Sequence, residues 1–460
     1  MAAFFTLCRW RAPHRLAGLL AAALLAGALA SRPAHAVDLW QAYQLARGHD
    51  ARLRAARAGT EAQRERLPQA QAQLRPQVAL GASRLHNDLS RTSANFLGQP
   101  VTVDERYWSE NLTLSVRQPL YRPALVAGVE VARAQVADAE AMLRVEENNL
   151  AARVAEAYLN VLLAQDQLEL VLVQRRAAEA QADAARKALA AGTGTRTDVD
   201  DVEARLDLLR ADELRARQQI DFARRQLEVL TGPLSSVPHP LDHERLTLPA
   251  LVPDGLQAWL ERAEAASPEL AALRARRDAA AREVERAAAG HRPTVDAVLQ
   301  LTRSASENVT TPSSRYTNRA IGIQLNVPLY SGGYVDSTVR QAVAELTRAE
   351  ENLESLRRDL FVRVAEQHRL VEEGVQRIQA LLRARESAQT ALRSSEMSQR
   401  AGVRTILDVL EAQQRLQNVE RELRAARYQQ LLARLRLLTL AGDDGGGEIE
   451  RLRELAAPAG

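Results

Sequence analysis

Apolar and polar residues alternate along four short stretches of this 460-residue chain. In the clearest stretch Val295, Ala297 and Leu299 are separated by single residues, which places them on one side of an extended segment. A period of two is typical of β-strands, so the pattern predicts four strands. The predicted strands are at about 77–86, 107–118, 294–304 and 317–327. Polar segments at 86–106 and 304–316 are expected to be the loops that join each pair.

A longer period follows each pair of strands. Apolar residues at spacings of four and three run from Leu150 to Val171, and the pattern recurs 210 residues later. This spacing predicts long helices that pack along one apolar seam. Gly192 and Gly402 interrupt the helical pattern, so each segment is expected to form a hairpin of two long helices. The expected hairpins are 122–231 and 334–440.

Short motifs repeat with the same displacement. Arg153-Val154-Ala155-Glu156 recurs 210 residues later as Arg363-Val364-Ala365-Glu366. A constant offset indicates two copies of one strand-strand-long-helix unit. The expected organisation is a first repeat, a connector, a second repeat and a C-terminal tail, at 37–232, 233–255, 256–442 and 443–460.

The N-terminus has the pattern of an export signal. Three arginines precede an apolar run at 16–30, and Ala34-His35-Ala36 then supplies small residues at the positions read by signal peptidase. The run is shorter than the roughly 20 residues that a membrane-spanning helix needs. We therefore interpret 1–36 as a cleaved signal peptide; the alternative is an N-terminal membrane anchor.

Composition excludes several classes of function. The chain has 61 basic Lys and Arg residues and 58 acidic ones, interspersed along the helical segments, so no nucleic-acid-binding surface is indicated. Cys8, the single cysteine, lies inside the expected signal. His239 and His243 lack further ligands nearby in the sequence, and no combination of residues suggests catalysis. We expect no enzymatic activity, no cofactor and no metal site.

Four strands place a constraint on assembly. The narrowest membrane barrels need about eight strands, so one copy of this chain cannot close a barrel. In an exported chain without an apolar membrane helix, alternating strands are typical of an outer-membrane barrel, which then requires several chains. The alternative is a pair of half-buried hairpins on a soluble domain.

Specific motifs point to a known family. Each second strand ends in Pro-Leu-Tyr, at Pro119 and at Pro328, and each hairpin tip has the pattern Gly-x-x-x-x-x-Asp-Val. Together with the signal peptide and the duplication, these pieces closely resemble the TolC family of outer-membrane channel proteins. The most specific segments are 327–333 and 402–411.

The resemblance implies a fold and an assembly. It implies a mainly α-helical chain with a transmembrane β-barrel contribution, which assembles as a homotrimer. Three chains would form a twelve-stranded barrel in the outer membrane and a twelve-helix coiled-coil tunnel across the periplasm. The implied partners are a periplasmic adaptor, an inner-membrane ABC or other transporter, outer-membrane lipid and a transported substrate.

The resemblance also assigns residues at the hairpin tips. It implies that Asp408 and Glu411 line a channel constriction, and that Arg404 holds the aperture shut through Thr197 or Asp198. Family members commonly have tyrosine three residues before the tip glycine, where this chain has Gln399. The tips themselves, Gly192, Gly194, Gly402 and Val403, are expected to contact the adaptor.

Simpler interpretations of the same residues remain open. Asp198 and Asp408 follow the glycine turns, where acidic residues stabilise helix N-termini without any role in a channel. Arg404 is equally interpretable as a solvated surface residue.

The predicted function is that of an exit duct. The tip motif is closest to the branch that secretes proteins such as RTX-type toxins and proteases by type I secretion. One alternative is the outer-membrane channel of a multidrug or metal efflux pump. An alternative of another class is a soluble periplasmic coiled-coil adaptor or scaffold, which would have no use for four alternating strands.

Overall fold

A computed structural model describes residues 37–234, 236, 238–239, 251–306 and 313–456. The expected signal peptide at 1–36 lies outside these residues, as do parts of the connector and of the loop between the third and fourth strands. The chain divides into two compact units, and each is considered by itself. The first unit comprises Met1–Ala46, Val154–Thr247 and Leu452–Gly460, and the second unit comprises Arg47–Arg153 and Leu248–Arg451.

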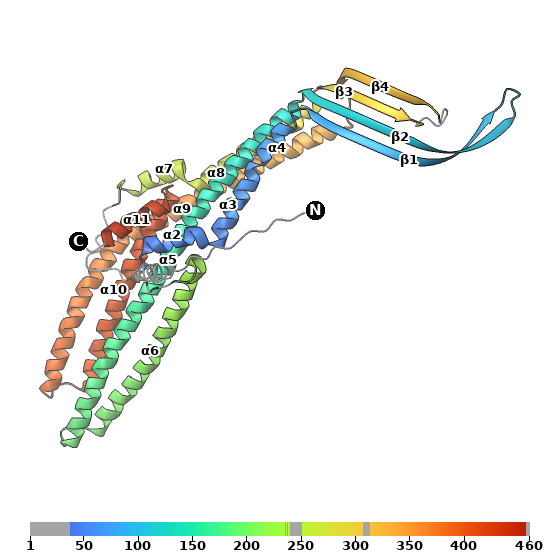
Figure 1. The fold of residues 1–460 in the computed structure, drawn as a ribbon. Helices are drawn as coiled ribbons and strands as arrows, with labels where there is room; N and C mark the ends of the chain where they lie inside the picture. The colour runs from blue at the N-terminus through green and yellow to red at the C-terminus, as the bar shows by residue number, and fades with distance from the viewer. Residues whose placement is uncertain (1–36, 235, 237, 240–250, 307–312, 457–460) are drawn as a thin grey trace, which may run out of the picture. The chain divides into compact units, whose positions relative to one another are not determined.

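The two repeats have the same order of elements, two strands followed by two long helices (Figure 1). The first repeat contains β1 (Gln77–Ala94), β2 (Pro100–Tyr121), α5 (Pro123–Ala190) and α6 (Arg196–Thr231). The second contains β3 (Thr294–Ala305), β4 (Arg315–Asn326), α9 (Tyr334–Arg400) and α10 (Ile406–Leu440). The predicted duplication is therefore confirmed.

Shorter helices precede the strands of each repeat. In the first repeat these are α2 (Leu39–His49), α3 (Ala51–Arg64) and α4 (Arg66–Ala72). In the second they are α7 (Leu256–Ala266), α8 (Pro268–Ala288) and the 3-10 helix η1 (Ala289–His291). None of the helices in the described ranges is both long enough and apolar enough to cross a membrane.

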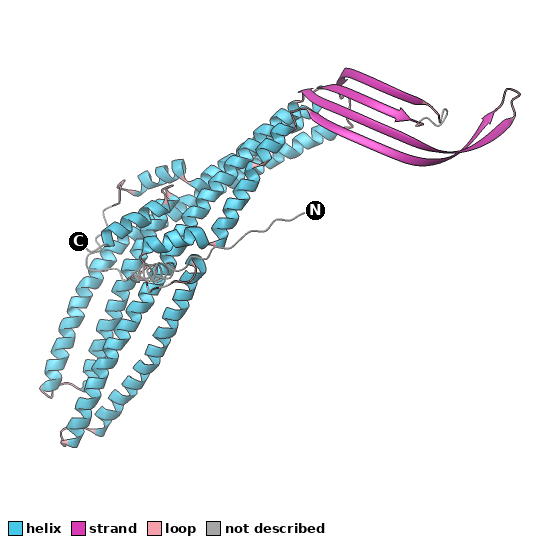
Figure 2. Ribbon diagram, in the orientation of Figure 1, coloured by secondary structure: helices cyan, strands magenta, loops and turns pink. Residues whose placement is uncertain are grey.

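All four strands, magenta in Figure 2, belong to one antiparallel sheet in the second unit, and their order in the sheet is β1-β2-β3-β4. The register pairs Leu80 with Leu114, Leu114 with Leu301, and Leu299 with Ile321. Residues opposite each other point to the same side of a sheet, so these apolar side chains share one face. Strands β2 and β3 join the two repeats, and β1 and β4 are the edges of this sheet.

The first pair of strands is longer than predicted. The polar segment 86–106 was expected to be a loop, but most of it belongs to β1 and β2. That prediction was wrong because polar side chains pair across the strands: Arg106 donates to Asp88 over 3.0 Å, and the hydroxyls of Thr92 and Thr102 lie 2.7 Å apart. Such cross-strand pairs stabilise a ladder even when apolar alternation is absent.

The segment interpreted as a C-terminal tail contains a helix, α11 (Gly445–Ala456). Ile449 is fully buried, and the carboxylate of Glu448 accepts a hydrogen bond from Nε of Arg434 over 3.1 Å. A Cβ atom at Gly445 would lie 2.7 Å from Cβ of Ala151, so the start of α11 requires a glycine for close packing. The expected tail is therefore a helix packed on α5.

A buried carboxylate connects the sheet to the first long helix. Asp296 of β3 is almost completely buried and accepts a hydrogen bond from Nε of Arg122, just before α5, over 2.9 Å. Nε of Arg117 on β2 lies 3.1 Å from the same carboxylate. Removing one partner of a buried charge pair is strongly destabilising, so this group fixes the place where strand becomes helix.

The core of the second unit lies where four helices meet. Trp259 of α7, Leu270 of α8, Leu360 of α9 and Leu437 of α10 are all buried in one apolar cluster. Leu360 belongs to the predicted apolar seam, and Val364 and Val371 extend it into the same cluster. The seam is therefore confirmed as the packing surface of the long helix.

Repeat-equivalent arginines fasten a short helix to the long helix in each copy. Arg153 of α5 lies 3.3 Å from Asp50, the residue that caps α3. Arg363, 210 residues later, pairs with Glu269 in the first turn of α8. Each arginine thus neutralises a carboxylate at a helix N-terminus, where negative charge is favoured by the helix dipole.

We predict that Leu360→Ala lowers the free energy of unfolding by about 2–5 kcal/mol, because it opens a cavity in the four-helix core. Leu360 has no exposed surface. The matched control is Val362→Ala, two residues further along α9, where the side chain is 68% exposed. It should change the free energy of unfolding by less than about 0.5 kcal/mol. Thermal and chemical unfolding of the detergent-solubilised protein measure both. Equal effects of the two substitutions would contradict the assignment of the seam.

Candidate functional site: the helical hairpin tips

The turn between α5 and α6 is a tight glycine-dependent loop in the first unit. Gly192 has a φ of 73°, a backbone conformation that residues other than glycine rarely adopt. The amides of Thr193 and Gly194 both donate to the carbonyl of Ala188, over 2.9 and 3.1 Å, and so satisfy the end of the helix. A Cβ atom at Gly194 would lie 3.0 Å from Cβ of Ala188, so this position also favours glycine.

The turn between α9 and α10, in the second unit, has the same construction. Gly402 has a φ of 76°. The amides of Val403 and Arg404 donate to the carbonyl of Ser398, over 2.9 and 3.4 Å. Two turns at equivalent positions with the same backbone geometry show that the repeat has kept its hairpin tips.

Each tip ends in a capping box that starts the second helix. The amide of Asp198 donates to Oγ1 of Thr195 over 3.1 Å, and the amide of Thr195 donates to Oδ2 of Asp198 over 3.0 Å. Thr405 and Asp408 repeat the arrangement, with 3.3 and 2.9 Å. The Thr-x-x-Asp spacing is present in the sequence and is typical of this cap. The second helix of the first hairpin, α6, begins at Arg196 directly after the Thr195 cap.

The cap holds Asp408 as a carboxylate. The Thr405 hydroxyl and then the Thr405 amide donate to it and lower the pKa of Asp408, and the nearby Arg404 and Arg415 charges act in the same direction. Hydrogen bonds to the charged form favour that form. Asp408 therefore carries a negative charge at any pH at which the protein is expected to work.

Glu411 lies one turn further along α10. Three-residue spacing on a helix puts it on the same side as Asp408. Its side chain is exposed, and Oε2 lies 3.9 Å from Nη2 of Arg415. The structure thus brings the two predicted constriction residues together on one helix face near the tip.

Arg404 has a partner that the sequence analysis missed. Its Nη1 donates to Oγ of Ser395 over 2.9 Å, within the same hairpin, and Ser395 is 2% exposed. The expected acceptors Thr197 and Asp198 belong to the first unit, where the hydrogen bonds of Asp198 go to Thr195. A serine nine residues upstream in a helix carries no sequence signal for this contact.

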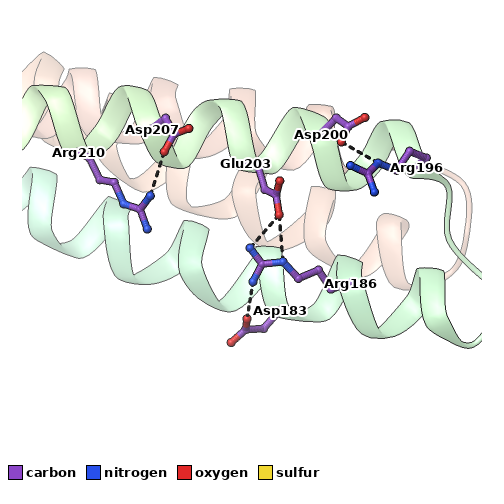
Figure 3. Close-up of polar contacts among 7 residues, drawn as sticks. All are labelled: Asp183, Arg186, Arg196, Asp200, Glu203, Asp207 and Arg210. Atoms are coloured by element: carbon purple, nitrogen blue, oxygen red, sulfur yellow. Dashed lines mark hydrogen bonds and ion pairs between the residues drawn. The ribbon is translucent and has the colours of Figure 1, made fainter.

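The first hairpin is held together by ion pairs between its helices (Figure 3). Arg186 of α5 lies 2.8 Å from Glu203 of α6 and 3.3 Å from Asp183 on its own helix. Further from the tip, Arg175 lies 2.6 Å from Glu213.

The second hairpin cannot form these pairs, because the positions equivalent to Glu203 and Glu213 are Gln413 and Leu423. Arg404 and Ser395 in turn have no counterpart in the first hairpin, which has Gly194 and Ala185 at those positions. The two hairpins therefore share a turn and differ in how their helices are joined.

The second tip exposes apolar side chains. Met397, Val403 and Leu407 are 63%, 79% and 51% exposed. The equivalent residues of the first tip, 210 positions earlier, are Lys187, Thr193 and Thr197. An apolar surface at the end of a hairpin is typical of a protein contact.

Across the described ranges no three His, Cys, Asp or Glu side chains come together in an arrangement that could hold a metal ion. The acidic residues of the tips are held instead by hydroxyl, amide and guanidinium groups.

Comparison with known proteins defines the class to which this architecture belongs. The chain matches the family described as outer membrane efflux protein at residues 42–233 and 259–443, which are the two repeats. The chain therefore belongs to the outer membrane efflux protein family. This family match contradicts the alternative of a soluble periplasmic adaptor.

Among curated relatives, the proteases secretion protein PrtF of Dickeya chrysanthemi is 33% identical, with 90% of each chain covered. The alkaline protease secretion protein AprF of Pseudomonas aeruginosa is also 33% identical, with 89% of this chain and 85% of the relative covered. The outer membrane protein TolC of Escherichia coli is 28% identical over 88% of this chain and 82% of its own length. The resemblance to the TolC family is thereby confirmed.

Solved structures confirm the fold. The outer membrane protein VceC of Vibrio cholerae has a TM-score of 0.75 at 22% identity, with 88% of this chain and 96% of that chain covered. The open state of the MtrE outer membrane channel of Neisseria gonorrhoeae has a TM-score of 0.73 at 20% identity, with 88% and 89% covered.

We predict that Thr405→Ala loosens the start of α10, because it removes the hydroxyl of the cap; the cost is roughly 1 kcal/mol. Hydrogen–deuterium exchange should become faster at 403–410 and stay unchanged in the first hairpin. The control is Thr347→Ala, on a threonine of α9 whose hydroxyl donates to the Val343 carbonyl one turn earlier in the same helix.

The contribution of the Asp408 carboxylate to this cap depends on pH. Because the folded-state pKa is lowered, the contribution is present above the ordinary carboxyl pKa and is lost as pH falls through the lowered value. Hydrogen exchange of the tip amides, corrected for intrinsic rates, should therefore show less protection on acidification. Unchanged protection would contradict this assignment.

Proposed function

We propose that this protein is the outer-membrane exit duct of a tripartite export system. It acts as a passive channel that receives substrate from an inner-membrane transporter through a periplasmic adaptor. The observation that carries the proposal is a sheet with one apolar face and two unpaired edges, continuous in one chain with very long helical hairpins.

The sheet edges support a trimer. β1 and β4 each present a row of backbone donors and acceptors that have no partner within the described sheet. Unpaired backbone groups in lipid cost several kcal/mol each, by the order of magnitude known for buried amides. Pairing β1 of one chain with β4 of the next satisfies both edges, and three copies give twelve strands, enough to close a barrel.

The long helices support an extension into the periplasm. α9 begins eight residues after β4 and has 67 residues, which corresponds to roughly 100 Å at 1.5 Å per residue. The tip of the second unit therefore lies far from the sheet, at the other end of the helix. In an outer-membrane protein this end faces the inner membrane.

The exposed tips support contact with an adaptor. Val403, Met397 and Leu407 give the second tip an apolar surface, while Gly192 and Gly194 shape a polar one in the first hairpin. Two different tips would offer an adaptor two different contacts around the trimer.

Charge at the second tip supports a constriction. In a trimer, Asp408 and Glu411 would be present three times each at the narrow end of the tunnel, where rings of carboxylates favour cations. The role of Asp408 in the cap is compatible with this, because the cap keeps its carboxylate ionised. Arg404, held by Ser395, would set the position of the tip and thus the resting width of the aperture.

The substrate is proposed to be a secreted protein, such as a protease or an RTX-type toxin. Support comes from two relatives, each covered over most of its length, whose names describe the secretion of proteases. The second candidate is efflux of small molecules, which the family description and the fusaric acid resistance protein FusA of Burkholderia cepacia favour, the latter at 27% identity over 80% of this chain. A strain that lacks this gene distinguishes the two candidates. Loss of protease export supports protein secretion, and loss of resistance to small toxic compounds supports efflux.

We predict that the mature chain is a trimer in the outer membrane, since each edge strand needs a neighbour within lipid. Mass measurement in detergent and fractionation of the cell envelope test this directly. Recovery as a stable monomer, or wholly in the soluble periplasmic fraction, would overturn the proposal.

We predict that replacing both Asp408 and Glu411 by alanine lowers cation selectivity in planar bilayers, because it removes negative charge from the narrowest part of the channel. Arg404→Ala should instead raise conductance, because it frees the tip from Ser395 while leaving the carboxylates in place. The control is Asp207→Ala together with Glu261→Ala, which removes two exposed carboxylates elsewhere and should leave selectivity unchanged. Retained selectivity in the double acid variant would mean that these carboxylates act only at the helix start.

A further inference from the structure

The apolar face of the sheet ends in a row of charged residues. This apolar band consists of Val78, Leu80, Ala82, Leu112, Leu114, Val116, Val295, Ala297, Leu299, Leu301, Ile321, Ile323 and Leu325. Ile321 is 86% exposed, as expected of a side chain that faces lipid. The band is placed on one face by the register of the four strands.

Four arginines lie on the same face where the apolar alternation of the strands ends, on the side away from the long helices. The register pairs Arg84 with Glu110, Arg303 with Leu112, Arg315 with Ala305, and Arg319 with Leu301. We call Arg84, Arg303, Arg315 and Arg319 the arginine rim. α5 follows the C-terminal end of β2, and α9 follows the C-terminal end of β4. The rim lies away from these ends, toward the turns of the two strand hairpins.

Three of the four rim arginines line a hollow on the sheet. Its volume is about 660 Å³, and its lining includes Arg84, Arg303 and Arg315 beside the apolar Ala82 and Leu112. A hollow of this size is comparable to a small-molecule site. Charged and apolar walls meet here, as a ligand with a charged head and an apolar tail would require.

A tryptophan marks the depth of the rim in the bilayer. Trp108 is exposed on the same face, one row beyond Arg84, and the Arg84 guanidinium lies 4.8 Å from the centre of its ring. The ring of His86 lies 4.9 Å from the same tryptophan. Tryptophan is enriched at the level of lipid headgroups, so the arginines are at headgroup depth.

Among the described residues, the rim carries more positive than negative charge. Arg84 lies 3.4 Å from Glu110, the one carboxylate of the hollow's lining. Within the parts of the chain that the structure describes, Arg303 and Arg315 have no carboxylate within 4.0 Å, and both are exposed. Guanidinium groups without a carboxylate at the edge of an apolar surface are suited to bind phosphate, which they contact through two parallel hydrogen bonds.

We propose that the arginine rim binds the phosphate groups of a lipid headgroup, with the acyl chains lying along the apolar band. The proposal rests on the proposed insertion of the sheet into the outer membrane. Because the rim is at the end of the band away from the helices, the lipid belongs to the outward-facing leaflet. The ligand class is a phosphorylated lipid, for which lipid A is the probe, and its binding would hold the strands at a fixed depth.

The experiment uses the full mature chain, purified in detergent and titrated with lipid A, with dephosphorylated lipid A and with inorganic phosphate. Native mass spectrometry measures the affinity. The double variant Arg303→Gln and Arg315→Gln should bind lipid A at least tenfold more weakly. Arg303→Lys with Arg315→Lys keeps the charge and should lose less than the glutamine variant. The control, Arg358→Gln with Arg369→Gln on exposed positions of α9, should bind as the unchanged protein does.

Three results would overturn the proposal: unchanged affinity in the glutamine variant, equal binding of dephosphorylated lipid A, or displacement of lipid A by an equal concentration of inorganic phosphate. An unchanged melting temperature of the glutamine variant shows that it still folds. A protein that inserts in the outer membrane and conducts ions, but shows no preference for phosphorylated lipid, would reject this inference alone. Failure to insert at all would reject the proposed function.

Discussion

The structure depends on burying one apolar stripe along a helix that is longer than any single partner. α9 has 67 residues and α10 has 35, so α10 can cover only part of the stripe as it runs back from the tip. The remaining part is covered by α8 and α7. Leu360 lies where these partners meet, in the cluster that also contains Trp259, Leu270 and Leu437. The short helices before the strands are therefore required by the length of the long one, and this explains why each repeat contains both.

Ion pairs fix the positions that apolar packing leaves free. A seam of Leu, Val and Ala permits neighbouring helices to slide, because one apolar contact resembles the next. Arg153 and Arg363 remove that freedom by pairing with a carboxylate at the start of α3 and of α8, at the same position in both repeats. Asp296 does the same at the junction of sheet and helix. Directional contacts of this kind specify one arrangement, while the apolar seam supplies most of the stability.

The two copies of the repeat share the geometry of their turns but differ in the side chains of the neighbouring helix faces. Both tips keep a glycine with positive φ, which ends one helix, and a Thr-x-x-Asp cap, which starts the next. The helix faces next to the turns differ between the two hairpins. The first hairpin has ion pairs between its helices. The second has exposed apolar residues and the contact between Arg404 and Ser395. The two tips are therefore chemically different although their turns are the same.

The sequence by itself determined the features that depend on neighbours along the chain. The two hydrophobic periods predicted the strands and the long helices, and the 210-residue offset predicted the duplication. Gly192 and Gly402 predicted where each hairpin reverses, and in the structure the second helix of each hairpin starts from a threonine cap, at Thr195 and at Thr405. Only the tertiary structure decided which distant groups meet. The extra length of β1 and β2 depends on polar pairs across the strands. The packing of α11 depends on a glycine beside Ala151, and the position of the Arg404 side chain depends on a buried serine. The arginine rim likewise appears only once the register brings four strands together. Local backbone preferences are written in consecutive residues, whereas these contacts arise from the folded packing and leave no periodic signal.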